Sequence, residues 1–168
     1  MLVLLLGILA AVVVSHVAGA GDDAREATLS ANLKMGRRQI VLYTAEHFGL
    51  LPCKQPDGSA ASDAEFMARM IGKTRPDGTI DPAGACGPYV RRWPANPFAP
   101  EAGARRVLIG DAPAPPRDGT TGWYLSSVTG LLYPNSKEGG ACYDPPDAVA
   151  PAPGRADLDD RPAPMPFR

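Results

Sequence analysis

An apolar run that passes without a break into an amphipathic segment, Met1 to His47, sets the architecture of this chain. Leu2 to Val14 carry no polar side chain, and the apolar character continues through Val17 and Ala20. About 20 such residues can cross a bilayer as a helix, because each residue adds about 1.5 Å. We therefore expect a membrane-spanning helix over residues 1–21 that continues outside the membrane.

The second half of this helix carries apolar residues on one side. Positions separated by alternating steps of four and three residues face the same direction on a helix. The positions that follow this spacing are Leu29, Leu33, Gly36, Ile40, Tyr43 and His47. We predict that the first five pack against the head, the part of the chain after residue 49. The helix should stop near Phe48, because Gly49 and Pro52 follow.

A cleaved secretory signal is the alternative interpretation of the first 20 residues. Ala18-Gly19-Ala20 has the form that a signal peptidase accepts. Signal peptides normally begin with a positive segment, whereas no Lys or Arg precedes this apolar core. The helical pattern also resumes directly after Gly21. These features favour a retained anchor over a cleaved signal.

The anchor contains small residues that suit contact between helices. Helices in lipid gain nothing from burying apolar surface against each other, so they associate through close packing. We assign helix–helix assembly to Leu4, Gly7, Ile8, Ala10 and Ala11.

Beyond the anchor there is room for one small domain. We expect three parts: residues 1–21 as the membrane and assembly helix, 22–142 as an α+β domain that includes the amphipathic helix, and 143–168 as a tail. Gly 18 and Pro 19 exceed a fifth of the 168 residues, so turns should outnumber regular strands. The tail has seven Pro in 26 residues and few large apolar side chains, which predicts an extended or disordered segment.

Local signals place the elements of the head. Ser62 followed by Glu65 is a capping box for a short helix that packs Phe66, Met70 and Ile71 on the long helix. A strand is expected at 105–109. Two aromatic runs, 123–126 and 131–133, should form a hairpin around a turn that contains Gly. The fold class that follows is α+β, with a long N-terminal helix packed on a small antiparallel β-sheet.

The residues give little support for catalysis. The only histidines are His16 and His47, so neither a Ser-His-Asp nor a Cys-His pair can be built inside the later domain. Metal-binding pairs and Gly-rich phosphate loops do not occur either, and we expect neither an enzyme nor a cofactor. Lys+Arg 17 nearly balance Asp+Glu 18, so nucleic acid is not an expected partner. Cys53, Cys86 and Cys142 permit one disulfide, and the sequence does not choose the pair.

The segment from Gly87 to Phe98 is dense in aromatic residues and prolines. Such a stretch can pack over a helix as an irregular loop, which is its default role. The alternative function is a signal-cleaved, secreted binding module with an aromatic surface built from Tyr89, Trp93 and Trp123.

Three segments in a fixed order resemble a known family. They are the anchor LLLGILAAVVV running into AREATLSANLKMGRRQIVLYTAEH, then GPYVRRWPANPF, then GWYLSSVTGLLYPN, and together they span about Leu4 to Asn135. The chain resembles a type II secretion system major pseudopilin, a branch of the type IV pilin superfamily. The residues of the family motifs are Gly87, Pro88, Tyr89, Pro94, Asn96, Pro97, Gly122, Trp123, Tyr124, Gly130 and Asn135.

The resemblance implies a pilin-like structural subunit. Such a subunit is held in the inner membrane by a single pass, with its C-terminal domain in the periplasm. It leaves the membrane when a helical pseudopilus assembles to drive protein export across the outer membrane. The implied partners are other copies of the chain, other pseudopilins, the secretion platform, and prepilin peptidase if a leader exists.

The resemblance also implies features near both ends. A processing peptide, a cleavage Gly, a Phe and a membrane-buried glutamate should precede the anchor, whereas Met1 lies inside the apolar run. Either the true start lies upstream or the leader was lost. Calcium is possible through an acidic family loop close to the C-terminus. Asn135 to Gly140 is not that loop, so no metal site is assigned.

Overall fold

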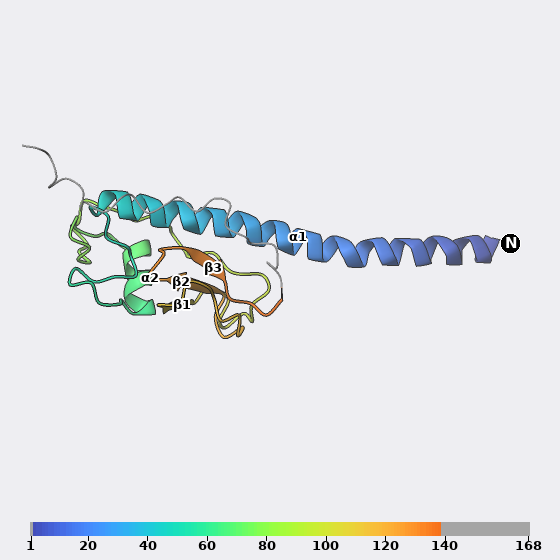
Figure 1. The fold of residues 1–168 in the computed structure, drawn as a ribbon. Helices are drawn as coiled ribbons and strands as arrows, with labels where there is room; N and C mark the ends of the chain where they lie inside the picture. The colour runs from blue at the N-terminus through green and yellow to red at the C-terminus, as the bar shows by residue number, and fades with distance from the viewer. Residues whose placement is uncertain (1, 139–168) are drawn as a thin grey trace, which may run out of the picture.

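The computed structural model describes residues 2–138, with side chains placed from Gly21 onward. Its elements, in chain order, are α1 (Leu2–Glu46), α2 (Asp63–Ile71), β1 (Val107–Gly110), β2 (Trp123–Ser126) and β3 (Leu132–Pro134). Helix α1 lies along the head with its C-terminal part, and its N-terminal part extends beyond the head (Figure 1). The fold is therefore α+β, as predicted.

Two predicted segments fall outside this description. The tail over residues 143–168 is one. The other is the membrane segment over residues 1–21, because side chains are described only from Gly21. In the part of the chain with described side chains, no helix is long and apolar enough to cross a membrane.

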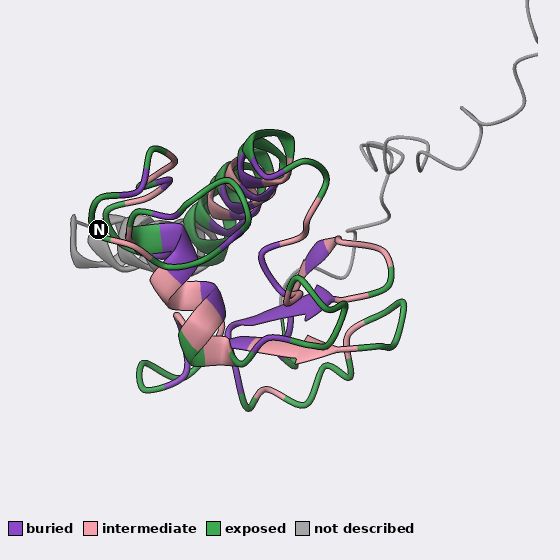
Figure 2. Ribbon diagram, turned by 90° about the vertical axis from the view of Figure 1, so that its left-hand side faces the viewer, coloured by how far each residue is buried: buried purple, intermediate pink, exposed green. Residues whose placement is uncertain are grey.

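The buried side of α1 coincides with the six-residue stripe. Leu29, Leu33 and Tyr43 are fully buried, and Ile40 is 3% exposed. At Gly36, an added Cβ would lie 2.7 Å from Leu132 Cδ2 of β3, so a larger residue there would require the Leu132 side chain to shift. In Figure 2, the buried residues of α1 are purple and its exposed residues are green.

Helix α2 begins where the sequence places it. The Ser62 hydroxyl accepts a hydrogen bond from Glu65 N, and the Glu65 side chain accepts one from Ser62 N, so the predicted capping box is confirmed. Phe66 and Met70 are fully buried, but Ile71 is 46% exposed, so its predicted packing is wrong. Ile71 is the last residue of α2 and lies about 100° around the helix from Met70, which turns it towards solvent.

The sheet has three strands in the order β1-β2-β3. Strands β2 and β3 pair antiparallel, with Trp123 opposite Pro134, which confirms the predicted hairpin. Strands β1 and β2 pair parallel, with Val107 opposite Trp123. The prediction of a wholly antiparallel sheet is therefore wrong. Residues 111–122 carry the chain from the end of β1 back to the level of its start, so β2 runs in the same direction as β1.

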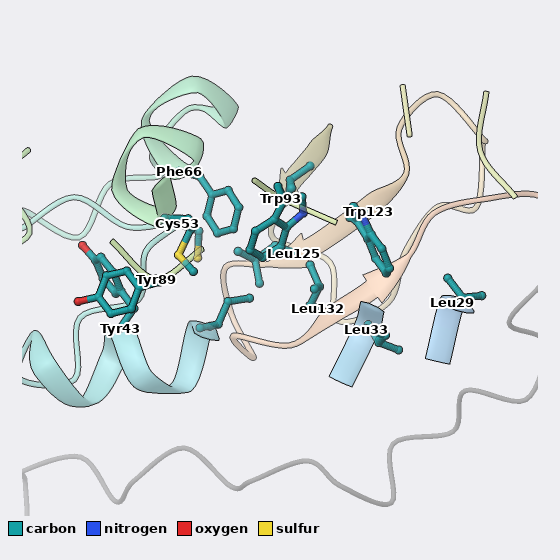
Figure 3. Close-up of a cluster of buried hydrophobic side chains, with 13 residues drawn as sticks. Leu29, Leu33, Tyr43, Cys53, Phe66, Tyr89, Trp93, Trp123, Leu125 and Leu132 are labelled. Carbon is teal, nitrogen blue, oxygen red and sulfur yellow. The ribbon is translucent and has the colours of Figure 1, made fainter. Parts of the chain in front are cut away.

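The core lies between α1, α2 and the sheet (Figure 3). Trp93 and Trp123 are its largest fully buried side chains. Trp93 meets Phe66 of α2 edge to face, with ring centroids 5.0 Å apart. The loop around Trp93 and the first residue of β2, Trp123, thus supply the largest side chains that fill the space between helix and sheet.

Candidate functional site

The face of α1 opposite the buried stripe is open to solvent. At about 100° per residue, Arg38 lies at the centre of this face. Met35 and Leu42 lie on one flank and Val41 on the other, exposed by 38%, 46% and 49% respectively. We call these four residues the outer face of α1. Exposed apolar side chains grouped on one side of a helix are typical of a protein interface.

The second motif segment, GPYVRRWPANPF, holds the end of α1 to the end of α2. The Tyr89 hydroxyl donates to Glu46 Oε2 at 2.6 Å, and its ring meets Tyr43 edge to face with centroids 5.3 Å apart. The backbone N–H groups of Tyr89 and Val90 both donate to Met70 O, at 3.0 and 3.1 Å. Gly87 and Pro88 precede this contact, and Gly87 has a positive φ of 73°.

Residues 95–98 of the same segment lie along α1, and two of their backbone carbonyls accept hydrogen bonds from side chains of this helix. Asn32 Nδ2 donates to Ala95 O at 2.8 Å, and the Arg25 guanidinium donates to Pro97 O at 2.9 Å. The same guanidinium lies 4.7 Å from the centre of the Phe98 ring. About two turns of α1, over residues 25–32, are therefore tied to one irregular loop.

The second and third motif segments are bonded to each other. Trp123 Nε1 donates to Pro94 O at 2.9 Å, and Asn96 Nδ2 donates to Gly122 O at 2.7 Å. Both Trp123 and Asn96 are buried. At Gly122, an added Cβ would lie 2.1 Å from Ala104 O, which leaves space for glycine alone.

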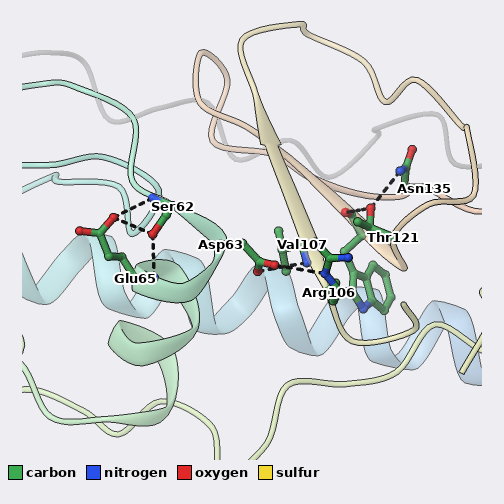
Figure 4. Close-up of polar contacts among 8 residues, drawn as sticks. Ser62, Asp63, Glu65, Arg106, Val107, Thr121 and Asn135 are labelled. Atoms are coloured by element: carbon green, nitrogen blue, oxygen red, sulfur yellow. Dashed lines mark hydrogen bonds and ion pairs between the residues drawn. The ribbon is translucent and has the colours of Figure 1, made fainter. Parts of the chain in front are cut away.

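Asn135 closes the same junction from the end of β3. Its Nδ2 donates to Asp118 Oδ1 at 2.8 Å and to Thr121 Oγ1 at 2.9 Å, and the second of these bonds is drawn in Figure 4. Tyr124 donates to Ala112 O at 2.7 Å, and Gly130, with a φ of 70°, lies in the turn between β2 and β3. The structure thus brings Pro94 and Asn96 together with Gly122, Trp123 and Asn135 as one packed junction.

Asp63, the first residue of α2, contacts the start of β1 through a hydrogen bond and an ion pair. Asp63 Oδ1 accepts a hydrogen bond from Val107 N at 3.4 Å, and Asp63 Oδ2 lies 3.6 Å from the Arg106 guanidinium (Figure 4). Both side chains of the ion pair are partly exposed, so its contribution to stability is about 0–1 kcal/mol.

The aromatic surface of the alternative function is not present on the head. Trp93 and Trp123 are fully buried, and Tyr89 is 9% exposed. The prediction of an aromatic surface is therefore wrong, because the three rings fill the space between α1 and the rest of the head. The prediction rested on aromatic residues that lie close together in the sequence. Aromatic residues also cluster in protein cores, so this pattern does not distinguish a binding surface from a core.

The predicted assembly residues lie in the part of α1 whose side chains are not described: Leu4, Gly7, Ile8, Ala10 and Ala11. Cys142 lies outside the described residues, and among those described Cys53 and Cys86 are free thiols. Burial raises the pKa of Cys53 to about 11, so it stays a protonated thiol near neutral pH. Within residues 21–138, no group of three or more His, Cys, Asp or Glu side chains could hold a metal ion.

Arg69 is a residue that the sequence analysis missed. It is 3% exposed, and its guanidinium donates to Pro52 O, Lys54 O and Gln55 Oε1. The only available signal was its place three residues after Phe66 and one before Met70, on the side of α2 that faces inward. A long charged side chain at such a position usually reaches solvent, so burial was not expected.

Comparisons with family models, with curated proteins and with solved structures found no match to this chain.

Proposed function

We propose that this chain is a structural subunit of a type II secretion pseudopilus, similar to the major pseudopilin of the type IV pilin superfamily, with a pilin-like fold. One observation carries the proposal. Helix α1 has 45 residues, and the head covers one side of its C-terminal part while the N-terminal part extends beyond the head. A helix of this length that extends beyond the head is suited to packing against copies of itself.

The sequence of the extended part supports the same proposal. Its apolar residues and small side chains suit a helix that is stored in the inner membrane and later packs against other helices. The head then remains in the periplasm. The partners we propose are further copies of the chain, other pseudopilins and the secretion platform, with prepilin peptidase acting on a leader if one exists.

The contacts between α1 and the head give the subunit the stiffness that such a role requires. Force applied along α1 reaches the head through the buried stripe, the Tyr89–Glu46 hydrogen bond and the Arg25 and Asn32 bonds to the loop. These contacts begin near residue 25 and end near residue 47, so they tie both ends of the covered helix to one body. A filament built from such subunits can push exported proteins without bending at the joint between helix and head.

Substitution of Gly7 by Leu tests the assembly surface. Added bulk at Gly7 prevents the close approach of neighbouring helices, so filament formation and protein secretion should fall while the head stays folded. Filaments are counted by electron microscopy after overproduction, secretion is measured in the culture medium, and unfolding of the head is followed by tryptophan fluorescence. Ala83→Leu also adds bulk, at an exposed position of the head outside the assembly helix, and it is the control.

Normal filaments from the Gly7→Leu chain would remove the packing argument. The wider proposal is tested separately by mass spectrometry of the mature chain, since an N-terminus at Gly21 indicates a cleaved signal and leaves no helix for assembly.

A further inference from the structure

Helix α1 is followed by a residue in a conformation that L-amino acids rarely adopt. Phe48 has a φ of 55°, in the left-handed region. A hydrogen bond of 2.9 Å from Gly49 N to Thr44 O closes the end of the helix, and this kind of closure places the residue between them in that region. Glycine is the usual residue at such a position, because a side chain there adds strain. Phe48 is therefore an unfavourable choice for the backbone.

The side chain of Phe48 does not contribute to the core either. It is 89% exposed, more than any other large apolar side chain among residues 21–138. Strain at a residue whose side chain remains almost fully exposed indicates a role outside the folding of its own chain. An exposed aromatic ring is typical of the central residue of a protein interface.

A hollow of about 300 Å³ lies at the other end of the head. The Arg25 guanidinium lies 4.7 Å from the centre of the Phe98 ring, which places the hollow beside the first turns of α1 that the head covers. A volume at the lower end of the range for ligand pockets suits a single aromatic side chain. The hollow combines apolar and charged surface, as the centre and rim of a protein interface do. Its described lining residues are Phe98, Pro100, Asp118, Gly119, Lys137 and Glu138.

Phe48 and the hollow lie about one head length apart along α1. Residues 25–48 span about 35 Å, at about 1.5 Å per residue. The contacts of Arg25 hold the hollow to one end of this span, and Phe48 is its other end. A contact between a projection at one end and a hollow at the opposite end is heterologous, so each copy can bind one neighbour at each end. Repetition of such a contact produces a filament unless the rotation between copies closes a ring.

The extended part of α1 has the length that this arrangement needs. Residues 2–24 span about 35 Å, which matches the part of the helix that the head covers (Figure 1). When one copy is displaced along α1 by one head length, its hollow meets the Phe48 end of the first copy. Its extended helix then lies beside the head of that first copy. The outer face of α1, on which Met35, Val41 and Leu42 are exposed, is available to receive it.

We propose that the hollow beside Phe98 receives the Phe48 side chain of a second copy of this chain. This inference rests on the proposed function, and it adds the contact that joins successive heads. The hydrogen bond that closes α1 fixes the backbone at Phe48, so mainly side-chain freedom is lost when the ring binds. Phe98 and Pro100 supply the apolar surface against which the ring is removed from water.

Substitution of Phe48 by Gly separates this role from a structural one. Gly relieves the strain at the end of α1, so the urea midpoint of the full chain in detergent micelles should rise by about 0.5 M. The number of filaments, counted by electron microscopy after overproduction, should nevertheless fall at least about tenfold, because the interface loses its central residue. Ile71→Ala is the control. It removes another exposed apolar side chain, at the end of α2, and should leave the number of filaments unchanged.

Cross-linking tests whether the hollow is the partner of Phe48. Ala45→Cys places a thiol one turn before Phe48, and Ala102→Cys places one two residues after Pro100, both at exposed positions. A short bismaleimide is added to cells whose chain carries both changes. It should link copies into a ladder of dimers, trimers and larger species. Addition of Phe48→Gly to this chain should abolish the ladder.

The matched control combines Ala102→Cys with Ala83→Cys, which is also exposed but lies elsewhere on the head, and it should give no ladder. All cross-linking chains carry Cys86→Ser and Cys142→Ser, so the only natural thiol left is the buried Cys53.

Three results would overturn the proposal. The first is a lower urea midpoint in Phe48→Gly, which would make the ring part of the fold. The second is a number of filaments that Phe48→Gly leaves unchanged. The third is a ladder that does not form, or that persists in Phe48→Gly. The ladder is read without filaments, and Gly7→Leu tests the anchor alone, so this contact and the proposed function stand or fail separately.

Discussion

The backbone of Ala104 lies so close to Gly122 that the junction has no space for a side chain at this position. An added Cβ there would lie 2.1 Å from Ala104 O, a backbone atom held in place by the hydrogen bond from Asn96 N. Gly122→Ala should therefore lower the free energy of unfolding by at least about 3 kcal/mol, the upper part of the range for overpacking. Urea unfolding of the full chain reports this loss through the fluorescence of Trp93 and Trp123, which are both buried.

Gly21→Ala is the control for this substitution. Gly21 is an exposed helical position with nothing within 4 Å of an added Cβ, so Ala should raise helix stability by about 0.5–1 kcal/mol. A loss at Gly122 no larger than about 1 kcal/mol would mean that the backbone at Ala104 moves aside, and that the junction is softer than its contacts indicate.

Helix α2 depends on its N-terminal cap. Ser62 and Glu65 exchange hydrogen bonds that satisfy two free N–H groups of the first turn. Ser62→Ala should lower the free energy of unfolding by about 1 kcal/mol. The same urea experiment measures it, and Ser30→Ala, in the interior of α1, should be neutral or slightly stabilising because Ala is the better helix former. Equal losses in the two variants would contradict the special role of the cap.

The regular spacing of apolar residues made the helices predictable. The direction of the strands could not be predicted in this way, because it depends on the path of the loops that connect them. The four-and-three spacing from Leu29 to His47 is a local property, and every one of its positions is buried. The direction of β1 relative to β2 is set by the path of residues 111–122, a loop of Pro, Gly and Asp whose turns do not reveal where it leads. A short hairpin turn, by contrast, allows one pairing of β2 with β3.

The polar contacts of the candidate sites were less predictable for a related reason. Asn96 and Gly122 are 26 residues apart, and so no local pattern pairs them. Arg69 was missed because its acceptors are backbone carbonyls of an irregular loop, and sequence patterns do not place carbonyls in space. The resemblance to a family marked Asn96, Gly122 and Asn135 as important, but their bonding emerges only from the folded chain.

At the scale of the whole molecule, exposed acids hold several of the irregular turns. Hydrogen bonds from the Ser or Thr two residues on lower the pKa of Asp57, Asp77 and Asp118 below the usual range of an Asp carboxyl. Asp118 also accepts from Asn135 of the junction. A carboxyl whose pKa is lower in the folded chain than in the unfolded chain stabilises the fold above the unfolded pKa, near 3.9 for Asp. This stabilisation disappears as the pH falls through the folded pKa.

The midpoint of urea unfolding should therefore stay level from pH 7 to about pH 5 and fall steadily below about pH 4. In a chain that carries Asp57→Asn, Asp77→Asn and Asp118→Asn, each amide oxygen still accepts the turn hydrogen bond but no proton is taken up on unfolding. Its midpoint should change less between pH 5 and pH 3 than that of the natural chain. An equally steep fall in the triple variant would place the acid sensitivity in other carboxyls, and the three turns would then contribute through geometry alone.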